Sequence, residues 1–187
     1  MSAPDLFRTV VAQLDAAEIP FMLTGSMAAA VHGAGRATLD IDLVIDATAE
    51  QLRALVDSLS SPDIYVSAET ALEALEQEAM FNVVEVHTGW KADLIIRKSR
   101  PFSRAEFARR RPMEFDGIRL WVATLEDMII AKLEWAKLGG SARQLEDVSN
   151  LLRVAASDVD QAYLDRWIDE LGLRSQWQSA RHGSDTP

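Results

Sequence analysis

The segment Leu39 to Ile45 constrains the fold more than any other part of the sequence, because it places two aspartates inside an otherwise aliphatic run. If the segment is a strand, the aliphatic residues at 41, 43 and 45 share one face and Asp40 and Asp42 share the other, about 7 Å apart along the backbone. Two neighbouring carboxylates are costly to bury unless cations accompany them. The pattern therefore predicts either an edge strand with both aspartates in water or a strand that holds cations.

The residues upstream favour the cation site. Phe21 to Leu23 reads as a short buried strand that breaks at Thr24-Gly25-Ser26, and the alanine-rich segment Met27 to His32 reads as a helix. Glycine allows close backbone approach, a serine hydroxyl donates a hydrogen bond, and a helix N-terminus favours an anion. Magnesium prefers hard oxygen ligands such as carboxylates and phosphates. The two motifs together predict a site for a metal-bound phosphate compound.

Gly25-Ser26 followed by Arg36-x-Thr38-x-Asp40-Ile41-Asp42 resembles the signature of the nucleotidyltransferase superfamily. Its form is most similar to the minimal, AbiEii-like transferases of abortive-infection and toxin–antitoxin systems. The resemblance spans residues 21 to 45. It implies an α+β nucleotidyltransferase fold that binds a nucleoside triphosphate (NTP), with two Mg²⁺ ions on a carboxylate site. The nucleotide-binding residues would then include Gly25, Ser26, Arg36 and Thr38.

The family also implies a third carboxylate on a neighbouring strand. Asp93, inside the apolar segment Trp90 to Arg97, is the candidate, and Glu85 on the preceding strand, Phe81 to His87, is the reserve. Asp93 would then join Asp40 and Asp42 as a metal ligand and catalytic residue. The alternative is that Asp93 is an exposed aspartate at the edge of a hairpin, whose turn is expected at Thr88-Gly89.

The resemblance extends into the C-terminal part through Thr124-x-x-Asp127, Lys132-Leu133 and Arg143-x-x-x-Asp147. It implies a catalytic, triphosphate-binding lysine at Lys132 and a functional aspartate at Asp147, although the lysine usual before that aspartate is absent. A lysine on an apolar helix face requires an anionic partner. That partner could be phosphate, or Asp147 itself on a packed neighbouring helix.

The order of the expected elements predicts an α+β protein. Residues 1–122 form the α/β core, residues 123–178 form a helical bundle packed on it, and residues 179–187 form a disordered tail. Thr48 to Gln51 is a capping box that opens a helix, and Thr124 begins another that Gly139-Gly140 ends.

Composition limits the partners. The net charge of −10 disfavours indiscriminate nucleic-acid binding. The arginine-rich segment Arg97 to Arg111 is open to two interpretations, a solvated surface or a docking patch for phosphates. The absence of cysteine excludes thiol chemistry, and no apolar stretch reaches the length that spans a bilayer. We expect a cytoplasmic protein with no membrane partner.

The aromatic and histidine residues are less informative. Trp121, Trp135, Trp167 and Trp177 are expected in the core or at subunit contacts, and Trp90 could stack on a base. His32 is interpreted as a helix-end residue.

The sequence thus predicts an enzyme that moves a nucleoside monophosphate from an NTP to an acceptor hydroxyl on transfer RNA, protein or a small molecule. The main alternative is a non-catalytic member of the same fold that serves as a binding partner or antitoxin. A cognate partner protein is compatible with both. A metal-dependent phosphohydrolase on another fold is the third possibility.

Overall fold

The computed structural model describes residues 3–34, 40–115, 117–155 and 159–184. Its described part contains one seven-stranded mixed sheet in the order β3-β4-β5-β2-β1-β7-β6. The strands are β1 (Phe21–Thr24), β2 (Asp40–Ile45), β3 (Ile64–Tyr65), β4 (Met80–Glu85), β5 (Lys91–Ile96), β6 (Arg111–Phe115) and β7 (Ile118–Val122). The helices are α1 (Ala3–Ala16), α2 (Gly25–Val31), α3 (Ala49–Leu59), α4 (Ala68–Gln77), α5 (Pro101–Arg109), α6 (Leu125–Gly139), α7 (Ala142–Ala155), α8 (Gln161–Glu170) and α9 (Arg174–Ser184).

Strand β2 lies in the middle of the sheet, which excludes the edge-strand interpretation of its two aspartates. It pairs antiparallel with β1 and parallel with β5. The antiparallel hairpin β4–β5 continues the sheet on one side, and β7 pairs parallel with β1 on the other. Ile41, Leu43 and Ile45 are fully buried, as their alternation predicts.

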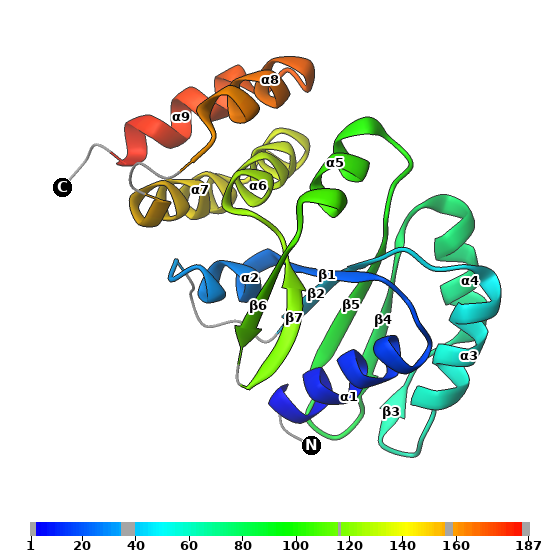
Figure 1. The fold of residues 1–187 in the computed structure, drawn as a ribbon. Coiled ribbons are helices and arrows are strands. Elements are labelled where there is room, and N and C mark those ends of the chain that lie inside the picture. Colours follow the sequence, from blue (N-terminus) through cyan, green and yellow to red (C-terminus); the bar gives the residue numbers. More distant parts are fainter. Residues whose placement is uncertain (1–2, 35–39, 116, 156–158, 185–187) are drawn as a thin grey trace.

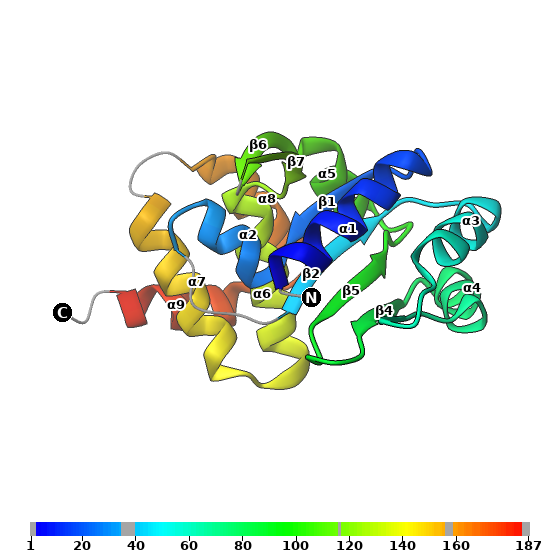
Figure 2. The same ribbon diagram turned by 90° about the horizontal axis from the view of Figure 1, so that it is seen from below.

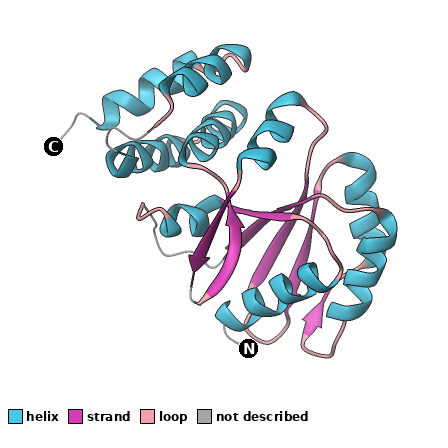
Figure 3. Ribbon diagram, in the orientation of Figure 1, coloured by secondary structure: helices cyan, strands magenta, loops and turns pink. Residues whose placement is uncertain are grey.

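Two groups of helices lie on opposite sides of the sheet's centre (Figure 1). Helices α3 and α4 pack together at the β3–β4 end, and α6, α7, α8 and α9 gather at the other end. Figure 2 shows the same separation from below, with α1 lying across the sheet between the groups. Coloured by secondary structure, the chain divides into a sheet-containing body and a purely helical C-terminal part (Figure 3).

Local sequence signals account for the ends of several helices. The capping box of α3 is present, since the Thr48 amide donates to Gln51 Oε1 and the Gln51 amide donates to Thr48 Oγ1. Helix α6 begins after Thr124, whose hydroxyl accepts from the Asp127 amide, and ends at Gly140 with a φ of 60°.

The structure differs from the sequence-based elements in several places, three of which bear on the site or the helices around it. Helix α5 and strand β6 occupy most of the segment expected to be an arginine-rich loop and helix face. The expected helix Ser67 to Met80 ends at Gln77, because Met80 begins β4. The expected disordered tail from residue 179 is wrong as far as Ser184, because α9 continues to that residue. There Ala180 is buried and its carbonyl accepts from the Ser149 hydroxyl.

Within the described residues, every helix is too short or too polar to cross a bilayer.

Candidate active site

A cavity of about 350 Å³ opens between the sheet and helix α6. It brings together segments that are far apart in the sequence: the β1–α2 junction, strands β2, β4 and β5, and helices α6 and α7. Its lining residues are Thr24, Gly25, Ser26, Asp40, Asp42, Met80, Asp93, Ile95, Met128, Ala131, Lys132, Trp135 and Gln144. The Gly-Ser pair, the three predicted carboxylates and the predicted lysine therefore face one volume.

Gly25 is required by its close approach to Asp42. The antiparallel register of β1 and β2 places Thr24 opposite Asp42, so the next residue lies beside the aspartate side chain. A Cβ atom on Gly25 would lie 2.0 Å from Asp42 Oδ2, and the backbone φ of +66° also favours glycine. Ser26 follows directly and is almost fully buried in the cavity wall. Helix α2 is only seven residues long, so its dipole contributes little to anion binding.

Asp42 and Asp93 are direct neighbours in the parallel pair β2–β5. Asn82 on β4 donates a hydrogen bond to Asp93 Oδ1 from the other side. The Lys91 ammonium lies 2.9 Å from Asp93 Oδ2 and 3.4 Å from Asp40 Oδ1, so it links the two outer carboxylates. The exposed hairpin-edge interpretation of Asp93 is wrong, since its side chain is only 9% exposed.

The carboxylate cluster has an excess of negative charge at its centre. The pKa of Asp42 rises from 3.8 to about 6, chiefly because the group is buried and then because Asp93 and Asp40 repel its charge. Lys91 and Lys132 lower the pKa in part. An additional cation would favour the ionised form of Asp42.

The donor set fits Mg²⁺, which prefers several carboxylate oxygens and completes its shell with phosphate and water. Among the residues that the structure describes, however, no three His, Asp or Glu side chains already converge on one point. Lys91 occupies part of the space between Asp40 and Asp93. Asp40, Asp42 and Asp93 therefore form a suitable but loosely gathered ligand set.

Lys132 extends from α6 and is 7% exposed. Its ammonium lies 2.7 Å from Asp147 Oδ2 and 3.3 Å from Gln144 Oε1, both on α7. The structure thus contains the Lys132–Asp147 pair that sequence analysis gave as one alternative. Lys132 and Gln144 also line the cavity, so the pair lies at its border.

The remaining predicted residues lie apart from the cavity or cannot be placed. Arg36 and Thr38 fall outside the described residues. Glu85 is buried near the β4–β5 turn, where its carboxylate accepts hydrogen bonds from the amides of His87 and Thr88. Glu85 therefore stabilises this turn. His32 ends α2 and contacts the Ala123 carbonyl at 2.8 Å, as expected for a helix-end residue.

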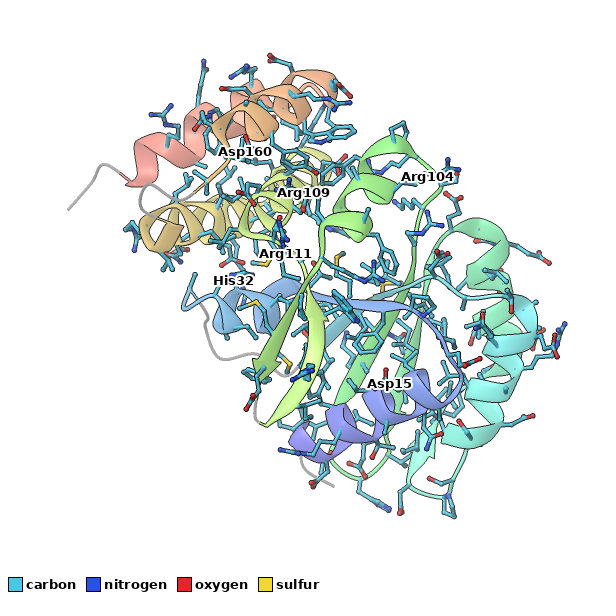
Figure 4. All side chains as sticks on the ribbon, in the orientation of Figure 1. Asp15, His32, Arg104, Arg109, Arg111 and Asp160 are labelled. Atoms are coloured by element: carbon cyan, nitrogen blue, oxygen red, sulfur yellow. The ribbon has the colours of Figure 1, made fainter. Side chains whose placement is uncertain are left out.

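Several arginines of the arginine-rich segment form ion pairs with carboxylates of the same chain. Arg97 pairs with Asp46, Arg100 pairs with Glu134, and Arg109 contacts Glu126 and Asp127. Figure 4 shows Arg109 at the junction between α5 and the C-terminal helices, with Arg104 near the outer end of α5. The Arg100 and Arg109 contacts fasten α5 to α6. All of these ion pairs weaken the interpretation of the segment as a phosphate-docking patch.

Sequence reasoning missed Lys91, Trp135 and Met80. Trp135 was expected in the core or at a subunit contact, yet its side chain lines the cavity and is 63% exposed. Trp121 is 42% exposed, whereas Trp167 and Trp177 are buried as expected. One signal could have identified Trp135, because it lies one turn after Lys132 on the same helix face.

No family model matches the sequence, and no curated protein matches it. Solved structures do. The solution structure of the antibiotic-resistance factor ANT(2'')-Ia aligns with a TM-score of 0.58 at 12% identity, over 96% of this chain and 95% of that chain. A crystal structure of the same factor with adenylyl-2''-tobramycin aligns with a TM-score of 0.51 at 14% identity, over 92% of this chain and 97% of that one.

A candidate nucleotidyltransferase from Thermotoga maritima aligns with a TM-score of 0.50 at 18% identity, over 75% of this chain and 90% of that chain. The chain therefore has the nucleotidyltransferase fold, as the sequence predicts. At these identities the likeness establishes the fold alone. The finer resemblance to AbiEii-like transferases stays a prediction.

Proposed function

We propose that this protein is a metal-dependent nucleotidyltransferase that moves a nucleoside monophosphate from an NTP to an acceptor hydroxyl. One observation carries the proposal. A single cavity gathers the Gly25-Ser26 pair, the Asp40, Asp42 and Asp93 carboxylates and Lys132 from separate parts of the chain. Phosphoryl transfer needs little from a protein except positioning and charge stabilisation, and these residue types supply both.

The proposal gives each group a function. Asp40, Asp42 and Asp93 would hold Mg²⁺, which when bound neutralises phosphate charge and orients the reacting oxygens. Gly25 allows the triphosphate to approach the backbone, and Ser26 donates a hydrogen bond to it. Lys132 exchanges Asp147 for the phosphates and offsets the negative charge that builds on the leaving group. Arg36 and Thr38 belong to the nucleotide-binding set on the resemblance alone.

The reaction is a displacement at the α-phosphorus. The acceptor oxygen forms a bond to that phosphorus, the bond from the phosphorus to the oxygen shared with the β-phosphate breaks, and pyrophosphate leaves. Asp93 takes the proton of the acceptor hydroxyl, because it lines the cavity in which the acceptor would meet the triphosphate.

Two observations bear on the acceptor. The chain carries a net charge of −10, and Arg97, Arg100 and Arg109 are held by carboxylates of the same chain. Both disfavour a polynucleotide acceptor. The structural neighbour ANT(2'')-Ia was solved with an adenylylated small molecule, tobramycin. We therefore favour a small-molecule or protein acceptor over transfer RNA.

The non-catalytic alternative receives less support. A binding partner that had lost activity is expected to close the phosphate site with its helices. Here α6 and the Gly25-Ser26 pair border an open cavity, and all three carboxylates are retained. Toxin–antitoxin membership, a cognate partner protein and a cytoplasmic location remain expectations from the sequence.

Calorimetric titration with each of the four ribonucleoside triphosphates, in Mg²⁺ and in chelator, tests the proposal. We expect binding that requires Mg²⁺ and that falls at least tenfold in Asp42→Asn, because that variant removes a central metal ligand. The matched control is Asp57→Asn, which makes the same change at an exposed position of α3. The proposal fails if the folded wild-type protein binds none of the four, or if Asp42→Asn retains Mg²⁺-dependent binding.

A further inference from the structure

The cavity that holds the carboxylates also has an apolar part. Besides its charged and polar residues, the lining contains Met80, Ile95, Met128, Ala131 and Trp135. Metal ions and phosphates need none of these side chains. The apolar part therefore suits a section of a ligand that carries no charge.

On the sheet side, the apolar part follows directly from the carboxylates. Asp93 and Ile95 are two residues apart on β5, so they share one face of the sheet. Met80 is the register partner of Ile95 on β4, as Asn82 is of Asp93. One step along the pleat, about 7 Å, therefore separates the carboxylate from an aliphatic surface.

On the helix side, Met128, Ala131, Lys132 and Trp135 are spaced as one face of α6. Lys132 and Trp135 are three residues apart, which is about 5 Å along the helix. Trp135 is 63% exposed although it borders the cavity. A large aromatic surface is thus left in water one turn beyond the cation expected to contact phosphate.

We propose that the indole of Trp135 is the stacking platform for the base of the bound NTP, with Met80 and Ile95 forming the apolar surface opposite. The inference rests on the proposed function. In a nucleotide the base is joined through the ribose to the α-phosphate, and Trp135 lines the same cavity as Ser26 and Lys132, so a base whose phosphates lie at those two residues shares that cavity with the indole. Of the parts of a nucleotide, the planar aromatic base is also the one that makes the most favourable contact with an exposed indole.

Two ligands separate stacking from phosphate binding. The first is the NTP that binds wild type most tightly, and the second is inorganic tripolyphosphate, which has the same charged part but no base. Both are titrated by calorimetry in Mg²⁺ into wild type, Trp135→Ala, Trp135→Phe and Leu138→Ala. Leu138 is the matched control, because it is 80% exposed one turn further along α6 and does not line the cavity.

We expect Trp135→Ala to weaken NTP binding about tenfold, since the substitution removes the aromatic surface on which the base stacks. Tripolyphosphate has no base to stack, so its binding to Trp135→Ala stays within about twofold of its binding to wild type. Trp135→Phe retains most of the NTP affinity, and Leu138→Ala matches wild type. Thermal unfolding confirms that each variant is folded, which is expected at exposed positions.

Two results overturn the stacking platform while leaving the proposed function intact. In one, Trp135→Ala binds the NTP as wild type does, which would fit a Trp135 that contacts the acceptor. In the other, the variant loses NTP and tripolyphosphate equally, which indicates a disturbed phosphate site. If wild type binds neither ligand, the proposed function fails and the platform fails with it.

Discussion

At the residue scale, the backbone of Gly25 packs directly against the side chain of Asp42, the central member of the carboxylate cluster. Replacing Gly25 by alanine would put a Cβ 2.0 Å from Asp42 Oδ2 and 3.0 Å from Asp42 Cβ. The carboxylate can yield only by rotating away. The absence of a side chain at Gly25 therefore leaves room for the Asp42 carboxylate where the structure places it.

We expect Gly25→Ala to lower the free energy of unfolding by about 1–3 kcal/mol, from left-handed backbone strain plus the clash. It should also abolish Mg²⁺-dependent NTP binding. Gly89→Ala is the matched control, because Gly89 has a similar φ of +74° and nothing within 4 Å of its added Cβ. Chemical denaturation and calorimetry measure both effects. Equal losses of stability in the two variants, with binding retained, would contradict the clash.

Asp42 also predicts how stability depends on pH. Its folded pKa of about 6 exceeds its ordinary 3.8, so its contribution to stability is complete below pH 3.8 and is lost as pH rises through 6. The loss in the metal-free protein is up to about 3 kcal/mol. Asparagine does not ionise, so Asp42→Asn should avoid this loss.

We therefore expect Asp42→Asn to be more stable than wild type by about 1–3 kcal/mol at pH 7 in chelator, with little gain at pH 4. Urea denaturation at the two pH values checks this, with Asp57→Asn as the exposed control. A gain of the same size at both pH values would show that charge burial is not its cause. The same substitution that stabilises the metal-free protein thus removes the expected metal site.

At the scale of elements, a polar network around the start of α6 joins α5, α6 and α8. Asp127 is fully buried and accepts from the hydroxyls of Thr124 and Tyr163, both at 2.6 Å. Arg109 contacts the same carboxylate, and its guanidinium lies 3.8 Å from the centre of the Tyr163 ring. Glu126 continues the network by accepting from the Asp160 amide, and Figure 4 labels Asp160 near Arg109. Asp127 therefore has a structural function rather than a place in the cavity.

We expect Tyr163→Phe to reduce the free energy of unfolding by about 1–3 kcal/mol, because it removes a hydrogen bond to a buried carboxylate. Tyr65→Phe should change it by less than about 0.5 kcal/mol, since that side chain is 62% exposed. Thermal and urea denaturation of both variants give the comparison. Similar small effects in the two would indicate that Asp127 is satisfied without Tyr163.

The elements that the sequence failed to predict share a physical cause. Helix α5 buries Phe102 and Phe107, which are five residues apart and do not follow a helical period. Ion pairs of Arg100 and Arg109 with α6 bind it to the body instead. Among the residues of α9 whose burial the structure describes, Trp177 and Ala180 are the apolar ones in the core, too few to stand out in a polar segment. Both helices depend on neighbours that local patterns do not reveal.

At the scale of the whole molecule, the sheet order decides which parts of the chain meet. Asp42 and Asp93 are distant in sequence, yet β2 and β5 are adjacent and parallel in the sheet order. The C-terminal helices then cover this region, and α6 brings Lys132 and Trp135 over the carboxylates. A chain with a net charge of −10 thereby assembles a local site where two lysines offset three aspartates.

The sequence by itself determined the fold class, the Gly25-Ser26 turn and the strand bearing Asp40 and Asp42. It also predicted Asp93 and Lys132 as site residues; both line the cavity, and their functions stay predictions. Each of these depends on local spacing or on a short motif, which neighbours in sequence define. Only the tertiary structure decided that Lys91 links Asp40 to Asp93 and that Lys132 pairs with Asp147. These are contacts between segments far apart in the chain, fixed by strand register and helix packing, which local patterns do not encode.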